Sequence, residues 1–522
     1  MNRSDSLKRI ATGDQWDILI VGGGASGLGA AVDAASRGYR TLLLEQSDFA
    51  KGTSSRSTKL VHGGVRYLKQ GNVGLVLEAL QERGRLRRNA PHLVHNLEFV
   101  VPVYDWWEGP FYGVGLRLYD MLAGRLGLGD SRNLSRDETL QSIPTLEPDQ
   151  LRGGVLYYDA QFDDARLAIT LARTATNLGA TLLNYARVTS VTKRDSLVSG
   201  VQALDEETGD LLDISAKVVI NATGVFTDNI RRMDDPEIQR MVRVSQGVHI
   251  VLDRSFLPGE TAIMVPSTED GRVLFAIPWH NKVVVGTTDT PVDSASLEPK
   301  PLEQEIEFLL KTAAQYLTKN PSPSDIQSAF AGLRPLVAPP DEQDTASISR
   351  EHVVSISRSG LVTIAGGKWT TYRQMAQDTI DQAAAIGQLP FTDSKTRSLR
   401  LHGSPENEAE SDQNDIDHLS VYGTDTEAIN SLIAERAELG ELIAEGLPYS
   451  AAEVVWAARY EMARTVEDVL ARRTRCLFLN AGSSITAAPK VAKILSDELG
   501  RDRHWQESQV TNYEKVARRY LA

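Results

Sequence analysis

Three glycines near the start of the chain have the spacing that binds a dinucleotide. Gly22, Gly24 and Gly27 form a G-x-G-x-x-G motif that follows the apolar run 16–21. In this motif the first glycine permits a tight turn, the second lets a pyrophosphate approach the backbone, and the third lets the helix pack close to the strand. The pyrophosphate then lies at a helix N-terminus, where unpaired N–H groups and the helix dipole favour negative charge.

A carboxylate follows at the place where a ribose would lie. Glu45 ends a second apolar strand, 40–44, and can accept hydrogen bonds from the hydroxyls of an adenosine ribose. The same carboxylate would repel a 2′-phosphate, so the sequence favours FAD or NAD over NADP. Strand, glycine turn, helix and second strand over residues 16–45 form one βαβ unit.

Several later segments continue this α/β pattern. KVVINATG, at 217–224, is an apolar strand that enters a glycine turn, and 361–385 again has the order strand, glycine turn, helix. Alternating apolar residues between 242 and 290 predict an antiparallel sheet. Residues 106–135 are aromatic, glycine-rich and irregular in pattern. Residues 418–522 are almost wholly helical in pattern and predict a separate C-terminal domain.

Composition limits the class of protein. A chain of 522 residues predicts two or three domains, and 69 acidic against 56 basic residues give a net charge of −13, which argues against nucleic-acid binding. The single cysteine, Cys476, excludes internal disulfides, iron–sulfur clusters and cysteine-rich zinc sites, and we expect no metal. The N-terminus lacks a signal-peptide pattern, and no apolar run reaches about 18 residues. We therefore expect a cytoplasmic chain that does not span a membrane.

Nine short blocks occur in order between about residues 16 and 376. They are VGGGASGLGAAVDAASRG, TSSRSTKLVHGGVRYL, YYDAQFDDARL, INATGVFTD, GVHIVLD, VGTTDT, AGLRPL, ISREHVV and GGKWTTYR. In this order they resemble the FAD-dependent glycerol-3-phosphate dehydrogenases of the D-amino-acid-oxidase-like flavoprotein superfamily. The segment ARYEMARTVEDVLARRTR, at 457–475, resembles the helical domain of that family more loosely.

The resemblance implies an α/β (α+β) fold in three parts. These are an FAD-binding Rossmann-like βαβ domain, an antiparallel-sheet substrate domain and an all-helical C-terminal domain. The expected boundaries are 1–75, 161–240 and 353–390 for the FAD-binding domain, 76–160 for a helical and aromatic insertion that could face a membrane, 241–352 for the substrate domain, 391–417 for a linker and 418–522 for the C-terminal domain.

The resemblance also identifies FAD as the cofactor and assigns its binding to small, hydroxyl or glycine positions. The implied residues are Gly22, Gly24, Gly27, Glu45, Thr53, Ser54, Ser57, Gly63, Val188, Gly224, Gly367 and Thr370. The hydroxyls at 53–57 would donate to the ribityl–pyrophosphate chain, and Gly63 would let the flavin ring approach. Val188, expected at the end of a strand, would hold the adenine. The helix after Gly367 would direct its N-terminus to the flavin C2 carbonyl.

Cations from distant blocks would bind the substrate, sn-glycerol 3-phosphate. A dianionic phosphate needs several charge-assisted donors, and the resemblance assigns them to Arg66 and Lys368, with Arg350 in support and Tyr67 nearby. Arg334 would stabilise the C2 oxygen and His249 would accept its proton, while the C2 hydride moves to flavin N5 and dihydroxyacetone phosphate forms. The sequence gives no distances, so these roles are exchangeable among the residues. The alternative for His249 is a buried histidine with a purely structural role.

The resemblance further implies that electrons pass to a membrane quinone. An oxidase of glycerol 3-phosphate, or of another hydroxy acid or amine, is the alternative, and a non-catalytic FAD-binding interaction module is an alternative of another class. Basic residues at 81–93 and aromatic and basic residues at 106–128 suit peripheral binding to lipid on the cytoplasmic face of the cell membrane. The competing interpretation is that the aromatic residues belong to the hydrophobic core and that the basic residues form a face exposed to solvent. The oligomeric state stays open, with a homodimer as one alternative.

Overall fold

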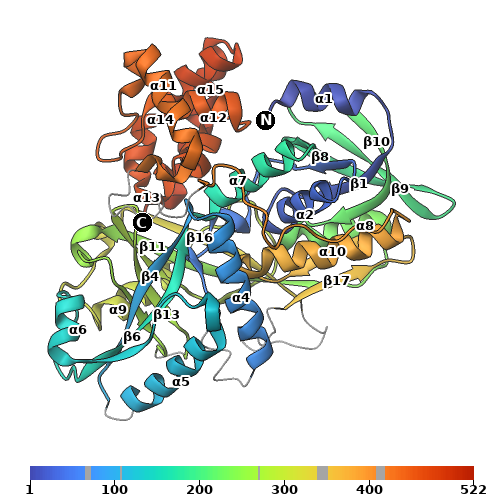
Figure 1. The fold of residues 1–522 in the computed structure, drawn as a ribbon. Helices are drawn as coiled ribbons and strands as arrows, with labels where there is room; N and C mark the ends of the chain where they lie inside the picture. The colour runs from blue at the N-terminus through green and yellow to red at the C-terminus, as the bar shows by residue number, and fades with distance from the viewer. Residues whose placement is uncertain (65–71, 106–107, 269–270, 338–350, 407–417) are drawn as a thin grey trace.

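Figure 1 shows the arrangement of the chain in a computed structural model. The structure describes residues 1–64, 72–105, 108–268, 271–337, 351–406 and 418–522. Two sheets and a helical C-terminal domain account for most of these residues. This architecture confirms the three-part α/β (α+β) fold expected from the sequence.

The first sheet is built around the glycine motif. Its order is β17-β18-β10-β1-β2-β7, and β9 and β8 extend it from β10. The strands are β1 (Trp16–Val21), β2 (Thr41–Leu44), β7 (Thr181–Leu183), β8 (Ala186–Arg194), β9 (Leu197–Asp205), β10 (Leu211–Asn221), β17 (His352–Ile356) and β18 (Val362–Gly366). Strand β1 is parallel to both β2 and β10. Its residues are almost all buried, as expected of a strand covered on both faces.

Helices cover the first sheet. They are α1 (Arg3–Ala11), α2 (Ala25–Ser36), α7 (Asp164–Asn177), α8 (Thr227–Asp234) and α10 (Tyr372–Ile386). Helix α2 follows the glycine turn and packs against both α7 and α10. The carboxyl ends of the parallel strands β1, β10 and β18 therefore open at one edge of the sheet, where ligands bind in folds of this kind.

The second sheet joins segments that lie far apart in the chain. Its order is β15-β11-β14-β13-β12-β4-β6-β3, with β16 beside β11 and β5 beside β6. The strands are β3 (Leu60–Val61), β4 (Val94–Val103), β5 (Arg132–Ser135), β6 (Gly153–Phe162), β11 (Val242–Asp253), β12 (Ala262–Val265), β13 (Leu274–Trp279), β14 (Lys282–Gly286), β15 (Thr290–Val292) and β16 (Ser328–Val337). Helices α6 (Arg136–Ser142) and α9 (Glu303–Ala314) lie along its edge and one face.

Two sequence expectations for 76–160 need correction. This segment is not only a helical insertion, because β4 and β6 form ten consecutive pairs in the middle of the second sheet. Residues 106–135 are also not irregular throughout, since α5 (Glu108–Ala123) is a helix that packs against α4 (Val73–Asn89). Glycines in α5 weaken the helical signal in the sequence, whereas burial of Leu116, Tyr119 and Ala123 on one face stabilises the helix.

The C-terminal domain is helical, as expected. It contains α11 (Thr426–Glu435), α12 (Ala451–Tyr460), a π-helical turn, Asp468–Arg473, α13 (Cys476–Leu479), α14 (Ala481–Leu499) and α15 (Arg503–Ala517). Phe478 of α13 packs edge-on against Phe330 of β16, with ring centres 4.9 Å apart. The hydrophobic core is thus continuous between this domain and the second sheet. Cys476 is buried in the same core, as a small apolar residue would be.

Candidate functional site

The glycine turn between β1 and α2 has no room for side chains. Gly22 has φ +112°, and a Cβ atom there would lie 2.5 Å from the carbonyl oxygen of Ala222 at the end of β10. A Cβ atom on Gly27 would overlap the carbonyl oxygen of Gly22. The turn therefore brings β1, β10 and α2 closer together than any other residue type allows. This is the cradle that a dinucleotide pyrophosphate requires.

Glu45 lies beside this turn at the end of β2. Its Oε2 accepts the Gly23 N–H at 2.6 Å, and its Oε1 accepts the Ser47 N–H at 2.9 Å. Burial raises the pKa of the Glu45 carboxyl, although the two backbone N–H groups act in the opposite direction. The two hydrogen bonds thus hold the Glu45 carboxylate beside the glycine turn, where the sequence predicts contact with the ribose of an adenosine.

The segment 53–57 runs past the start of α2. Ser54 Oγ accepts the Ala25 N–H at 2.9 Å, so this hydroxyl lies at the helix N-terminus and keeps its own hydrogen for a further acceptor. Thr53 instead donates to the carbonyl oxygen of Leu333 in β16 at 2.5 Å. Ser57 donates through both its N–H and its hydroxyl to Asp164. Of these three hydroxyls, Ser54 lies best to meet a pyrophosphate.

Two further glycine turns meet the same edge of the first sheet. Gly224 (φ +57°) follows β10, and Gly367 (φ +80°) follows β18. Thr370, in the short helical turn before α10, donates to the carbonyl oxygen of His62 at 3.2 Å. The neighbouring Trp369 donates through Nε1 to the carbonyl oxygen of Ser54 at 3.0 Å. Three segments far apart in the sequence are thereby joined around one site.

Gly63 lies at this site, but Val188 is placed differently from its prediction. A Cβ atom on Gly63 would lie 2.7 Å from the Tyr119 hydroxyl, whose oxygen accepts the Gly63 N–H at 2.7 Å. Val188 does not end a strand: it is the third residue of β8 and pairs with Ala203. The sequence predicts one strand through this region, but it is interrupted at Tyr185, which adopts φ +54°. Strand β7 therefore ends at Leu183, and Val188 belongs to the next strand, β8.

The second sheet presents Arg334 to this site. The guanidinium of Arg334 donates to Asp289 at 3.2 Å, to the Thr287 hydroxyl at 3.1 Å and to the Thr288 carbonyl oxygen at 3.1 Å. It also lies across Gly247 of β11, where a Cβ atom would overlap it. Arg334 is about one fifth exposed, so its orientation is set by these contacts rather than by solvent.

His249 lies on the same face of β11, two residues from Gly247. The ring is buried, stacks on Phe330 at 4.9 Å between centres, and its Nε2 lies 2.9 Å from the Thr58 hydroxyl. Burial lowers the pKa of His249 well below its usual value, and the charges of Lys59 and Arg334 lower it further. The imidazole is therefore neutral at neutral pH.

A buried cation, Lys59, stabilises the segment 53–59 that adjoins this site. The ammonium of Lys59 donates to Asp164 at 2.7 Å and to the Ser55 carbonyl oxygen at 2.9 Å. Burial lowers the pKa of Lys59 to about 7, against the attraction of Asp164. Arg475 of the C-terminal domain contacts the same Asp164 at 3.0 Å. The 53–59 segment is thus fixed by charges from two other parts of the chain.

The remaining predicted substrate residues divide into two groups. Lys368 precedes the Trp369–Thr371 turn and is partly buried at the edge of the first sheet. Arg66, Tyr67 and Arg350 lie outside the residues that the structure describes. Their assignment to the substrate stays a prediction.

Sequence reasoning missed the residues that make room for the two predicted catalytic side chains. Gly247 accommodates the guanidinium of Arg334, and Gly286, which pairs with His249 across the sheet, accommodates the ring of His249. Thr58 and Asp289 supply hydrogen-bond partners to these side chains. All four lie within the short blocks found in the sequence, so the blocks marked the segments, but contacts between strands were needed to identify the roles.

Two family models match the chain. Residues 17–373 match the family described as FAD dependent oxidoreductase. Residues 358–507 match the family described as C-terminal domain of alpha-glycerophosphate oxidase. The two matches together cover both sheets and most of the helical C-terminal domain.

Similar proteins extend over the same range. The mitochondrial glycerol-3-phosphate dehydrogenase of Homo sapiens is 40% identical over 100% of this chain and 75% of its own length. The protein of that name from Macaca fascicularis is 41% identical over 98% of this chain and 75% of its own length. The crystal structure of the glycerol-3-phosphate dehydrogenase from Bacillus halodurans complexed with FAD is 29% identical, covers 100% of this chain and 98% of that one, and has a TM-score of 0.81.

Proposed function

Because this chain belongs to the family of FAD-dependent glycerol-3-phosphate dehydrogenases, we propose that it oxidises sn-glycerol 3-phosphate to dihydroxyacetone phosphate. One structural observation supports the proposal most directly. Thr53, at the dinucleotide cradle, donates to the carbonyl oxygen of Leu333, the residue next to Arg334. The cofactor segment and the predicted substrate cation therefore adjoin.

The residues present fit FAD, since three glycine turns, Glu45 and Ser54 converge on one sheet edge. When bound, FAD accepts the hydride that leaves C2 of the substrate. Arg334 would bind the C2 oxygen and stabilise the negative charge that develops there, because its guanidinium is already oriented by Asp289 and Thr287. Lys368 would contribute charge to the binding of the phosphate, together with Arg66 and Arg350.

His249 is our candidate for the group that receives the C2 hydroxyl proton. A neutral imidazole has a lone pair available, and burial keeps this ring neutral. The nearby cations Lys59 and Arg334 disfavour a lasting imidazolium, so the proton must move on after transfer. Thr58, whose hydroxyl lies 2.9 Å from Nε2, is the first group that could relay it.

The substrate proposal predicts selective reduction of the bound flavin. Under anaerobic conditions, sn-glycerol 3-phosphate should bleach the yellow absorbance, whereas glycerol, amino acids and hydroxy acids without phosphate should not. The reason is that a dianion recovers its desolvation cost only against fixed cations. Absorbance measured for each compound in turn checks this. A yellow protein that none of the compounds bleaches would support a non-catalytic FAD-binding module instead.

We further propose a membrane quinone as the electron acceptor. The similar proteins from Homo sapiens and Macaca fascicularis are named dehydrogenases. The L-alpha-glycerophosphate oxidase of Mycoplasma pneumoniae, with FAD bound, is 17% identical, covers 74% of this chain and 98% of that one, and with a TM-score of 0.57 shares the fold alone. Aerobic turnover that forms stoichiometric hydrogen peroxide would contradict the quinone and favour the oxidase.

We also propose peripheral binding to a lipid surface on the cytoplasmic face, and helix α5 supports the contact with lipid. Three apolar side chains on its outer side are exposed: Val114 by 70%, Leu118 by 44% and Met121 by 78%. Arg117 lies among them and is also exposed. Apolar and basic residues on one helix face suit an anionic bilayer surface. No helix in the described part of the chain is long and apolar enough to cross a membrane.

In the basic stretch at 81–93, in contrast, two of the four arginines are already paired. Arg83 is buried and pairs with Asp159 at 2.5 Å, and Arg85 pairs with Glu82. Glu82 also accepts both branches of Arg373 from α10. Arg83 and Glu82 therefore join α4 to β6 and α10, whereas Arg85 pairs within its own helix and Arg88 is exposed. The membrane proposal depends mainly on α5.

Replacing the exposed apolar residues of α5 should release the protein from lipid. We expect the double variant Leu118→Asp/Met121→Asp to bind anionic vesicles at least roughly tenfold more weakly, since burial of even one apolar side chain contributes about 1.5–3 kcal/mol. Phe391→Asp is the matched control, because Phe391 is also 78% exposed but lies far along the chain, after α10. Vesicle sedimentation at low salt measures both. Equal binding of the double variant and the wild type would refute the role of α5.

A further inference from the structure

The loop that follows β2 supports the glycine turn from outside. Within this loop, Glu45 accepts the N–H of Gly23 at 2.6 Å, and Ala50 donates its own N–H to the carbonyl oxygen of Gly23 at 2.9 Å. A Cβ atom on Gly23 would lie 2.9 Å from both Glu45 and Phe49. The position of the 45–50 loop and the shape of the dinucleotide cradle are therefore directly linked.

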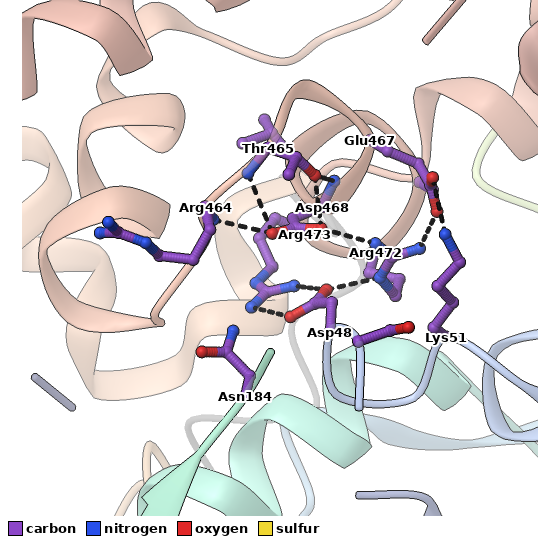
Figure 2. A network of polar contacts seen from close by, with 12 residues as sticks. Asp48, Lys51, Asn184, Arg464, Thr465, Glu467, Asp468, Arg472 and Arg473 are labelled. Atoms are coloured by element: carbon purple, nitrogen blue, oxygen red, sulfur yellow. Dashed lines mark hydrogen bonds and ion pairs between the residues drawn. The ribbon is translucent and has the colours of Figure 1, made fainter. Parts of the chain in front are cut away.

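The middle of this loop is held by the C-terminal domain. Asp48 is fully buried, and its carboxylate accepts from Arg472 Nε at 2.5 Å and from the Arg473 guanidinium at 2.5 and 3.0 Å. Both arginines are buried and belong to the π-helical turn 468–473, as Figure 2 shows. Among the residues that the structure describes, the Asp48 carboxylate pairs with these two arginines and with no group of the FAD-binding domain.

The same turn reaches the loop by two further routes. Tyr185 donates its N–H to the carbonyl oxygen of Ser47 at 2.9 Å and its hydroxyl to Asp468 at 2.7 Å. Arg472 also donates to Asp468, at 2.8 Å. Just after the loop, Lys51 pairs at 2.9 Å with Glu467, the residue that precedes the turn (Figure 2). The loop is thus connected to the π-helical turn directly at Asp48, through Tyr185 at Ser47, and through the ion pair of the next residue, Lys51.

Burial makes these contacts interdependent. A buried carboxylate without a partner is strongly unfavourable, so Asp48 can occupy its position only while the arginines are docked. Conversely, Asp48 stabilises the docked arginines: burial lowers the pKa of each guanidinium, and the charge of Asp48 contributes most to raising it again. Any ligand that stabilises the 45–50 loop must then also stabilise the docked C-terminal turn, because coupling between two sites is reciprocal.

We propose that Arg472 and Arg473 are positioning residues for the adenosine end of the FAD site, and that they act through Asp48 and the 45–50 loop. The C-terminal domain would thereby control how tightly the cofactor is held, although it contributes no residue to the cradle itself. The proposal rests on FAD as the cofactor and does not depend on which substrate is oxidised.

The test is the rate at which the holoenzyme releases FAD. Arg473→Met removes the two hydrogen bonds that Arg473 donates to the Asp48 carboxylate. We expect FAD release to become roughly 5- to 150-fold faster, which is the usual range of coupling between two sites. Arg464→Met is the control: Arg464 forms an ion pair with Glu207 of the FAD-binding domain at 2.7 Å but its side chain does not contact the 45–50 loop. The control should release FAD at the wild-type rate. Flavin fluorescence after dilution measures all three proteins.

Further readouts separate positioning from general instability. With FAD saturating, the KM for glycerol 3-phosphate and the rate of flavin reduction should stay at wild-type values in Arg473→Met. If that variant does not fold, Arg473→Lys keeps the positive charge but lacks the two-branched guanidinium. Its rate of FAD release should be faster than that of the wild type, but by less than the factor expected for Arg473→Met. Equal acceleration in Arg464→Met would mean that domain docking alone matters and would overturn the proposal. Unchanged release from folded Arg473→Met or Arg473→Lys would also overturn it.

Discussion

Gly27→Ala should yield protein without FAD. The added Cβ atom would overlap the Gly22 carbonyl oxygen, which belongs to the backbone and cannot rotate away. Forced overpacking costs about 3 kcal/mol, which corresponds to a loss of affinity of roughly 100-fold. The ratio of flavin to protein absorbance after purification measures the result. Gly74→Ala, in α4, is the control, because a Cβ atom there has no heavy atom within 4 Å.

A second variant keeps this prediction testable if Gly27→Ala does not fold. In Gly24→Val the added side chain would enter the space between the start of α2 and Ser54, whose Oγ lies 3.0 Å from the new Cβ position. The backbone is not forced to move, so we expect a folded but colourless protein, and circular dichroism should match that of the wild type. A yellow Gly24→Val protein would show that the pyrophosphate does not lie at this turn.

Arg334→Ala should mainly slow flavin reduction at saturating substrate. The guanidinium would act on charge that develops only as the C2 proton and hydride leave, so its loss affects the transition state more than binding. A lost hydrogen bond to a charged group costs about 1.5–3 kcal/mol, or roughly 10- to 150-fold in rate. Stopped-flow measurement of flavin reduction at a series of substrate concentrations gives the limiting rate and the half-saturation concentration separately.

Lys368→Ala should show the opposite pattern, with the half-saturation concentration raised by a similar factor and the limiting rate little changed. Arg254→Ala is the control, since Arg254 pairs with Glu260 in the same substrate-binding part of the chain and lies outside the site. Wild-type limiting rate and saturation in both Arg334→Ala and Lys368→Ala would contradict the assignment of these cations. Glycerol or an amino acid would then be the better candidate substrate.

The sequence by itself determined the cofactor and the family. A glycine motif with an acid at the end of the next strand leaves few alternatives, because only glycine tolerates the backbone contacts at positions 22 and 27. Nine blocks in order then identified FAD and the glycerol-3-phosphate dehydrogenase family, and the comparisons confirm both. The three-part fold followed from the same blocks and from the helical pattern beyond residue 418.

The tertiary structure decided what the polar residues contact. From sequence, Ser54 and Ser57 are equivalent hydroxyls, yet one caps α2 and the other binds Asp164, a residue more than one hundred positions away. The helical pattern of α5 is weak because its glycines carry no packing signal, and only its burial against neighbouring elements reveals it. Likewise, Arg472 and Arg473 resemble ordinary surface charges until the fold buries them against Asp48. Local pattern reports how a segment folds, whereas the partner of a charged or polar side chain depends on which distant segment lies opposite.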